Sequence, residues 1–444
     1  MGSFSTPLSG LMAAQDQLQS VSNNLANIDT DGYKDQTLTF SDIFANTGAT
    51  NGAGDPIQTG SGVAVSSTDS NFTEGNLNAT GTLSNMAISG NGFFVTQSAS
   101  GLPDYTRAGD FTVNSAGQLT TPNGELVMGY PATAGVVNTS GTLQTLQIGS
   151  GVTMAAHVST MVGFTANLDS DTATLGTTTS SPVSVYDSLG SAHTVSVAYT
   201  KTAANTWTYT VSVPSADLTG ATGTTWVVGS GQLNFNTDGS LNSVGAVGGT
   251  IAAPGVPVPI SIGGPGSAAV VGPPAIPAVP ATSLADGAAS PLTLTGPFGK
   301  AGNFTITQTA TASATSAETT DGFASGTLGS NYSILPNGTI EGTFSNGQTL
   351  ALGQVALASF ANVQGLASIG NNNYQPTTAS GSAVVGLAGT GGRGTIVGGS
   401  VEQSNVNIAS EFAKLIVAQQ AYSANAKSIT TFNQISQATL AMIQ

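Results

Sequence analysis

The sequence predicts a mainly β protein whose two chain ends form paired α-helices. Apolar residues recur at coiled-coil spacing in two long segments, 6–28 and 406–443. Between them, short runs of alternating apolar and polar residues are separated by Gly, Asn and Pro, as in strands joined by tight turns. With 58 glycines and only 7% charged residues, Ser, Thr, Asn and Gln must supply the polar surface of these strands. We therefore expect a coiled-coil-like helical domain together with all-β domains.

The charge and composition exclude several classes of function. The formal net charge is −15, from 7 Lys and Arg against 22 Asp and Glu, and the basic residues are scattered. We therefore expect no basic patch that binds nucleic acid or an anionic membrane. The chain has no Cys, so it has no disulfides, no zinc–cysteine site and no thiol chemistry. No run reaches the roughly eighteen apolar residues of a membrane span, and the polar N-terminal segment does not resemble a signal peptide.

The first helix is expected from Thr6 to near Ile28. Thr6 can cap the helix with its hydroxyl, and Pro7 fits the first helical position. Leucines follow at intervals of seven, with a second apolar residue three places behind each, which predicts a narrow seam against another helix. The residues that form this seam are Leu11, Ala14, Leu18, Val21, Leu25 and Ile28. Asn27 can end the helix, and Gly32 can take the positive φ of a turn that redirects the chain.

The last helix is expected from Val406 to Ile443. Its apolar residues lie on a grid of alternating four- and three-residue steps, which also predicts a narrow seam. The residues on this grid are Ile408, Phe412, Leu415, Tyr422, Ala426, Ile429, Leu440 and Ile443. Further apolar residues, including Ile416 and Val417, lie outside the grid, so one partner helix cannot cover them all. We therefore expect both seams to be surfaces between subunits, whereas the alternative is a two-helix stalk within a monomer.

The middle of the chain is predicted to form short strands and turns. Residues 35–70 are polar and Gly-rich, and we expect an irregular connector with short extended pieces. A strand should follow the Asn-Gly turn within 88–95, and a strand, a turn and a return strand should occupy 105–119. Alternation of Val, Tyr and Trp with polar residues predicts three more strands between 183 and 213. The stretch 251–291 is rich in Pro, Gly and Ala, which favours a surface excursion over central strands.

Two terminal motifs resemble those of a known protein family. The run NLANIDTDGYK (Asn24–Lys34), with Gly32 and Tyr33 at its centre, is similar to the N-terminal signature of the flagellar axial proteins of rods and hooks. The run EQSNV (Glu402–Val406) is similar to the C-terminal signature of the same family. By this resemblance Asn27, Gly32 and Tyr33 belong to a family-signature turn.

The resemblance implies a nested domain plan. Segments that resemble the family's inner β-domain lie on both sides of residues 150–325, and VYDSLGSAHTV (185–195) within this block resembles the outer domain of hook proteins. Each outer domain would then be an insertion in the next inner one. The expected parts are a terminal helical domain that lines a tube (1–30 and 404–444), a connector (31–70 and 376–403), an inner β-domain (71–149 and 326–375) and an outer inserted β-domain (150–325).

The same resemblance implies a structural subunit of the bacterial flagellar hook, which assembles into a flexible helical tube and carries motor torque to the filament as a universal joint. Its partners would be copies of itself, a hook-capping protein, the distal rod protein, the hook–filament junction protein and the flagellar export apparatus. It would act outside the cell, at the hook and basal body, after export without a cleaved signal peptide. Two alternatives stay open: a distal-rod subunit, which would lack the large 150–325 block, and a secreted β-rich adhesin, which would not need matched terminal seams.

The sequence contains no convincing enzyme site. The two histidines, His157 and His193, lie in no nucleophile or metal-ligand motif. Carboxylates such as Asp110 and Asp187 lie beside turn residues, where capping is the commoner role. Residues Gly389–Gly394 spell GxGxxG, but no predicted helix opens on them, as a dinucleotide fold requires. We therefore expect no catalytic, cofactor or metal site.

Overall fold

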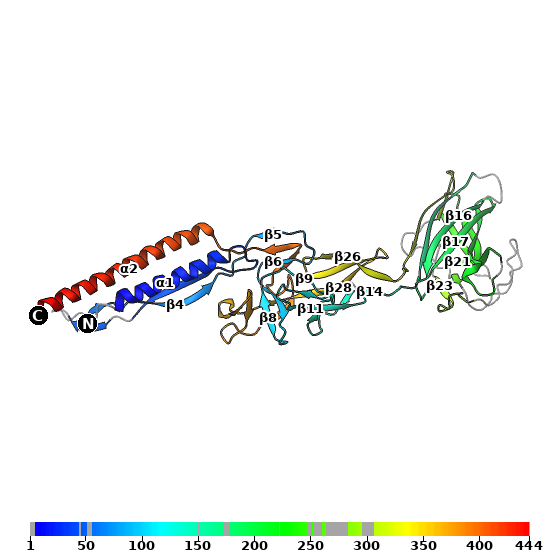
Figure 1. The fold of residues 1–444 in the computed structure, drawn as a ribbon. Coiled ribbons are helices and arrows are strands. Elements are labelled where there is room, and N and C mark those ends of the chain that lie inside the picture. The colour runs from blue at the N-terminus through cyan, green and yellow to red at the C-terminus, as the bar shows by residue number, and fades with distance from the viewer. Residues whose placement is uncertain are drawn as a thin grey trace. The chain divides into compact units, whose positions relative to one another are not determined.

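The computed structural model describes residues 5–43, 46–50, 56–149, 151–171, 178–221, 223–246, 251–252, 260–262, 283–294 and 306–443. As predicted, these residues form a mainly β structure with an α-helix toward each chain end, α1 (Ser5–Ala26) and α2 (Ile408–Ile443) (Figure 1). The chain divides into two compact units. Unit 1 comprises Met1–Val152, Leu328–Thr343 and Thr349–Gln444, and unit 2 comprises Thr153–Thr327 and Phe344–Gln348. Most of the Pro-rich stretch 251–291, predicted to be a surface excursion, lies outside the described residues.

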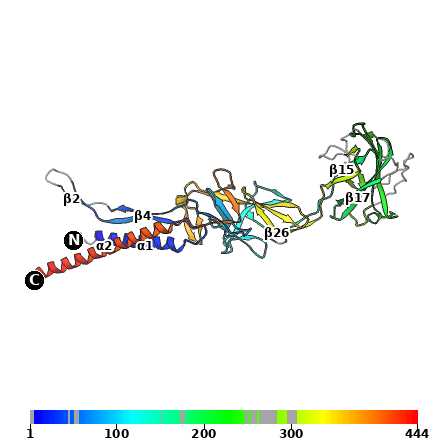
Figure 2. The same cartoon turned by 90° about the horizontal axis from the view of Figure 1, so that it is seen from above.

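In unit 1 the two helices lie side by side and antiparallel (Figures 1 and 2). Toward one end of the pair, Asn24 Nδ2 donates a hydrogen bond to Glu411 Oε2 at 3.1 Å. Toward the other end, Gly10 approaches Asn425 so closely that a Cβ on Gly10 would lie 2.8 Å from Asn425 Nδ2. Since α2 has 36 residues and α1 has 22, α2 continues for several turns beyond the level of Ser5. Neither of these described helices combines the length and apolarity needed to cross a membrane.

The described residues within 36–70 form two antiparallel strand pairs, the longer of which contacts α1, where we predicted an irregular connector with short extended pieces. The strands are β1 (Gln36–Asp42), β2 (Asn46–Thr50), β3 (Pro56–Thr59) and β4 (Val63–Ser70), with β1 paired antiparallel to β4 and β2 to β3. The prediction was wrong because β1 and β4 are rich in Thr and Ser and bury almost no side chain, so they lack the alternation that marks a strand. Contacts with α1 fix them instead. The side chain of Asn24 donates to Gln36 O and accepts from Gln36 N–H, both at 2.9 Å.

The β part of unit 1 is built on an antiparallel sheet that contains the strand order β27-β28-β11-β7-β8-β30-β29. These strands are β7 (Phe93–Gln97), β8 (Pro103–Thr106), β11 (Leu126–Thr133), β27 (Thr339–Phe344), β28 (Thr349–Ser359), β29 (Ala367–Gly370) and β30 (Asn373–Gln375). Shorter elements complete the unit: β5 (Leu77–Ala79), β6 (Met86–Ser89), β9 (Thr112–Val113), β10 (Leu119–Thr120), β12 (Val136–Val137), β13 (Gln144–Thr145), a 3-10 helix (Val363–Gly365), β31 (Val384–Leu387), β32 (Thr395–Gly398) and β33 (Ser400–Glu402). The predicted strand after the Asn-Gly turn is β7, and the predicted strand, turn and return strand end in β9 and β10, where Val113 pairs with Leu119. Aromatic side chains dominate the core of this sheet, among them Phe93, Tyr105 and Tyr374.

Unit 2 contains a six-stranded antiparallel sheet in the order β16-β17-β18-β19-β20-β21 and a three-stranded sheet in the order β24-β15-β25. The elements are β14 (Thr153–Met154), β15 (Val162–Asp169), β16 (Thr178–Tyr186), β17 (Ala192–Ala203), β18 (Thr206–Pro214), a 3-10 helix (Ser215–Asp217), β19 (Thr225–Phe235), β20 (Leu241–Ala246), β21 (Ile251–Ala252), β22 (Ile260–Ile262), β23 (Leu292–Leu294), β24 (Ile306–Thr309), β25 (Ala314–Thr320) and β26 (Gly326–Ile334), which continues into unit 1. The three strands predicted from alternation are confirmed as β16, β17 and β18. Their alternate side chains, including Val185, Tyr199 and Trp207, lie in one core because successive side chains of a strand point to opposite faces.

Candidate subunit-assembly surface

The seam predicted on the first helix is largely covered within one chain. α1 contacts both α2 and the hairpin strands β1 and β4. Ala14 and Val21 are buried, with 4% and 3% of their surfaces exposed. The other predicted seam residues are half-buried, namely Leu11, Leu18, Leu25 and Ile28. Ile28 lies in the turn just after the end of α1.

The seam predicted on the last helix is only partly covered within one chain. Leu415 and Ile429 are half-buried. Four predicted seam residues are exposed, namely Ile408 (51%), Phe412 (48%), Tyr422 (39%) and Leu440 (63%). The side chain of Ile443 is not among those described. A single chain therefore leaves most of this apolar seam in contact with water.

A different line of α2 faces α1. Glu411, Ala418 and Asn425 recur every seven residues along this line. Glu411 contacts Asn24 and Asn425 contacts Gly10, while Ala418 between them is fully buried. This line contains no large apolar residue, so hydrophobic spacing in the sequence does not mark it. The signal that could have identified this contact is the small size of Gly10 and Ala418, because small side chains allow two helix backbones to approach closely.

A network of polar side chains lies where α1 ends and α2 begins. Asn24 is fully buried, and its Oδ1 accepts a hydrogen bond from the Tyr33 hydroxyl at 3.1 Å. Glu411, on the other side of Asn24, also accepts from Lys414 Nζ at 2.6 Å. Burial, reinforced by the negative charges of Asp35 and Glu411, raises the pKa of Tyr33 to about 12. The Tyr33 hydroxyl therefore keeps its proton and acts as a donor at neutral pH.

The predicted signature turn connects α1 to the hairpin. The Asn27 N–H donates to both Asn23 O and Asn24 O at 3.2 Å, at the end of the helix. Gly32 has a φ of +70°, and a Cβ there would lie 2.5 Å from the backbone nitrogen of Ala108. The Gly32 N–H donates to Glu402 O at 2.6 Å. The turn therefore needs glycine twice, for its φ and for the close approach of two backbones.

A buried charge cluster holds the two signature motifs together. Glu402 Oε1 accepts from Lys34 Nζ at 2.5 Å, and Glu402 Oε2 accepts from Arg107 Nη1 at 3.1 Å. Arg107 Nη2 also donates to Gly90 O at 2.7 Å, and Lys34 Nζ donates to Thr73 O at 2.6 Å. Burial lowers the pKa of Lys34 and of Arg107, against the opposing effect of the Glu402 charge. No spacing pattern links these three residues in the sequence. The available signal was the place of Lys34 and Glu402 at the ends of the two motifs, in a chain with only 7 basic residues.

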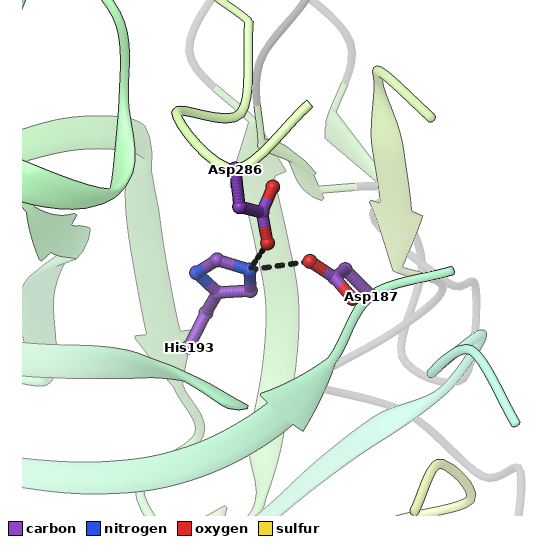
Figure 3. Close-up of side chains that lie close together, drawn as sticks. All are labelled: Asp187, His193 and Asp286. Atoms are coloured by element: carbon purple, nitrogen blue, oxygen red, sulfur yellow. Dashed lines mark hydrogen bonds and ion pairs between the residues drawn. The ribbon is translucent and has the colours of Figure 1, made fainter. Parts of the chain in front are cut away.

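A second ionisable cluster lies in unit 2 around His193 (Figure 3). His193 Nε2 lies 3.0 Å from Asp187 Oδ2 and 3.8 Å from Asp286 Oδ2, and Nδ1 lies 3.2 Å from Asp217 Oδ2. Burial opposes the charged forms, but the hydrogen bonds outweigh it. They raise the pKa of His193 above its usual range and lower the pKa of Asp187 to about 2. Asp187, His193 and Asp286 also have the spacing of metal ligands, yet a protonated His193 already balances part of their charge, so we interpret them as a structural ion-pair cluster.

Four family models match successive parts of the chain. The model described as flagella basal body rod protein matches residues 4–34, and the flagellar hook protein FlgE/F/G D1 domain matches 87–160. The flagellar basal body protein FlaE D2 domain matches 156–323, and the flagellar basal body rod FlgEFG protein C-terminal model matches 397–442. Both terminal motifs lie inside matched segments.

Relatives match over nearly the full length. The flagellar hook protein FlgE of Escherichia coli is 34% identical over 97% of this chain and 98% of its own length. The flagellar hook protein FlgE of Treponema pallidum is 34% identical over 97% of this chain and 97% of its own length. Among solved structures, the crystal structure of Helicobacter pylori flagellar hook protein FlgE2 aligns with 74% of this chain and 100% of its own, with a TM-score of 0.47 and 15% identity.

Proposed function

The chain belongs to the flagellar hook protein family and is a structural subunit of the hook, and we propose that its terminal helices pack against those of other copies to form the inner wall of the hook tube. Hook subunits are structural rather than enzymatic, and they act by polymerising in the flagellar basal body. In this proposal the helix pair is a coiled-coil-like inner domain, and the seam residues are contacts between copies.

The exposed apolar residues of α2 carry this proposal. Phe412 and Ile416 are about half exposed, at 48% and 57%, and Val417 is 63% exposed. Burying the exposed half of one such side chain contributes about 1 kcal/mol. Since α1 already covers the line through Ala418, these side chains need partners outside their own helix pair. A subunit that repeats this contact with successive neighbours, without closing a ring, forms a filament.

The chain order supports a nested arrangement of the β parts. The residues of unit 2, mainly 153–327, interrupt the sequence of unit 1, and the two helices enclose everything else. We propose that unit 2 is the outer inserted β-domain, that the rest of unit 1 supplies the inner β-domain and connector, and that the terminal helical domain lines the tube. Contacts made by Ser, Thr, Asn and Gly can be exchanged at little net cost, which suits a tube that bends while it transmits torque.

The family also supports a set of partners and a location. We propose that the subunit contacts a hook-capping protein at the growing tip, the distal rod protein below and the hook–filament junction protein above. Its place would be outside the cell, reached through the flagellar export apparatus without a cleaved signal peptide. Neither nucleic acid nor membrane is needed in this arrangement.

Replacing Phe412 tests the role of the seam. Phe412→Asp places a charge on the exposed face of α2 without changing the line that contacts α1, so the helix pair should stay folded. At the subunit contact, however, the buried carboxylate would cost several kcal/mol. We expect normal circular dichroism but no polymer by sedimentation and negative-stain electron microscopy. Ser140→Asp, in an exposed turn of the β part of unit 1, adds the same charge outside both helices. It is the control and should polymerise. Normal tubes from Phe412→Asp would contradict the proposal.

A further inference from the structure

The terminal helices carry very few charges, and two of these form no ion pair with any residue that the structure describes. The only charged residue of α1 is Asp16, and α2 has three, Glu411, Lys414 and Lys427. Glu411 and Lys414 form an ion pair at 2.6 Å. Among the described residues, neither Asp16 nor Lys427 forms an ion pair, and both are exposed. One acid and one base are therefore left over on the two helices.

The antiparallel register prevents these two residues from meeting within one chain. Asn24 lies opposite Glu411, and Gly10 lies opposite Asn425, so fourteen residues on α1 match fourteen on α2. Asp16, eight residues before Asn24, therefore lies at the level of Gln419, which is eight residues from Lys427. At about 1.5 Å per residue, the two charges are separated by about 12 Å along the helix axis. A second copy, shifted along the axis, can bring them together.

Asp16 lies in a groove that could receive a helix from another copy. The groove has a volume of about 760 Å³ and is bounded by α1 and by the strands β1 and β4. The strands contribute apolar side chains, Leu38 and Val65, and Val65 is 38% exposed. α1 contributes polar side chains such as Ser20 together with the carboxylate of Asp16. The groove therefore combines an apolar wall with a single negative charge.

The C-terminal part of α2 has the complementary features. By the same register, residues after Thr430 lie beyond the level of Ser5, the first residue of α1. Two large apolar side chains there, Ile435 at 56% and Met442 at 86% exposed, are seven residues apart and therefore lie on one face of the helix. Lys427 lies three residues before Thr430 and is the last charged residue of α2. An apolar helix face with a single positive charge matches an apolar groove with a single negative charge.

We propose that the C-terminal part of α2 docks in the α1–hairpin groove of a neighbouring copy, where Lys427 pairs with Asp16. This inference rests on the proposed function and specifies which surfaces of two copies meet. An exposed ion pair is a weak contact, but it is sensitive to geometry and to the wrong charge. The Asp16–Lys427 pair therefore sets the axial offset between neighbours, while the apolar side chains supply most of the affinity.

Charge exchange tests the pair. Asp16→Lys and Lys427→Asp each replace an attraction with a repulsion, and each should raise the critical concentration for polymerisation about tenfold. The double variant restores opposite charges and should return within about twofold of the unchanged chain. Gln15→Lys adds the same charge one residue away, about 100° around the helix, and should have little effect. Single variants that polymerise normally, or a double variant no better than the worse single one, would overturn the pairing.

Cross-linking gives a second test, because the chain has no cysteine of its own. In Asp16→Cys with Lys427→Cys, oxidation of assembled tubes should give a ladder of covalent multimers on a non-reducing gel. A bond within one chain is excluded, since cysteines more than about 7 Å apart between Cα atoms cannot be joined. Gln15→Cys with Lys427→Cys is the control and should remain monomeric. Failure of the ladder in tubes that form normally would reject this docking surface and leave the proposed assembly intact, whereas normal tubes from Phe412→Asp would reject the assembly model itself.

Discussion

Replacing Glu402 with Gln should destabilise unit 1 strongly and leave unit 2 unchanged. The Glu402 carboxylate is fully buried and accepts hydrogen bonds from Lys34, from Arg107 and from the backbone N–H of Gly75 at 2.9 Å. Gln keeps the shape but removes the charge, and its amide group places a donor against another donor. Breaking a buried ion pair by removing one partner costs about 3–5 kcal/mol. For a unit of this size the melting temperature should fall by about 10 °C.

Two spectroscopic signals separate the units in this experiment. Both α-helices belong to unit 1, so the far-ultraviolet circular dichroism of helix follows its unfolding. Both tryptophans, Trp207 and Trp226, belong to unit 2, so intrinsic fluorescence follows the other unit. Glu402→Gln should shift only the helix signal, and Glu341→Gln, a half-exposed carboxylate of unit 1, is the matched control. A loss below about 1 kcal/mol, or a shift equal to that of the control, would refute the reasoning.

Three further changes have expected outcomes. Gly32→Ala should cost unit 1 about 3 kcal/mol in thermal unfolding, because its φ is positive and its Cβ would lie 2.5 Å from the backbone of Ala108; a neutral effect would show that the turn can shift. Since ion pairs raise the pKa of His193, its contribution to the stability of unit 2 is complete below its ordinary value of 6.5 and is lost as the pH rises through the raised value. The contribution of Asp187, whose pKa is lowered, is present above pH 3.8 and is lost as the pH falls toward 2. When unfolding is followed by fluorescence across this pH range, the His193→Gln variant should no longer lose stability as the pH rises through the pKa of His193. Ala418→Leu should force α1 and α2 apart at a cost of about 1–3 kcal/mol, and an unchanged helix signal would contradict the close packing.

The elements with strong periodicity could be predicted from the sequence. Leucines at intervals of seven indicated α1, and the alternation of apolar and polar residues from Trp207 to Val213 indicated β18. Each element buries one face, and this imposes a period on its sequence. The hairpin strands β1 and β4 were missed because they are fixed by polar contacts with α1 and bury almost no side chain of their own. A pattern based on hydrophobicity cannot detect a strand of this kind.

The candidate site was predicted only where large apolar residues mark it. Apolar spacing identified Phe412 and Leu415, but it could not show which side of α2 meets α1 in the same chain, since that line consists of Ala418 and polar residues. The cluster of Lys34 with Glu402 depends on a contact across 368 residues. Such a pairing is set by the tertiary fold, and neither motif contains information about the other's position.

That distance along the chain also determines the order in which unit 1 can form. Closing a loop of 368 residues costs about 5 kcal/mol of chain entropy by the logarithmic law, so the Lys34–Glu402 contact is a poor nucleus for folding. Local pairings such as β7 with β8 close short loops and can form much earlier. If the chain emerges with its N-terminus first, the signature turn cannot form its contacts with Glu402 until nearly all of the chain except α2 has emerged. The N-terminal and C-terminal segments of the subunit therefore pack against each other at the end of folding, after the β part between them has folded.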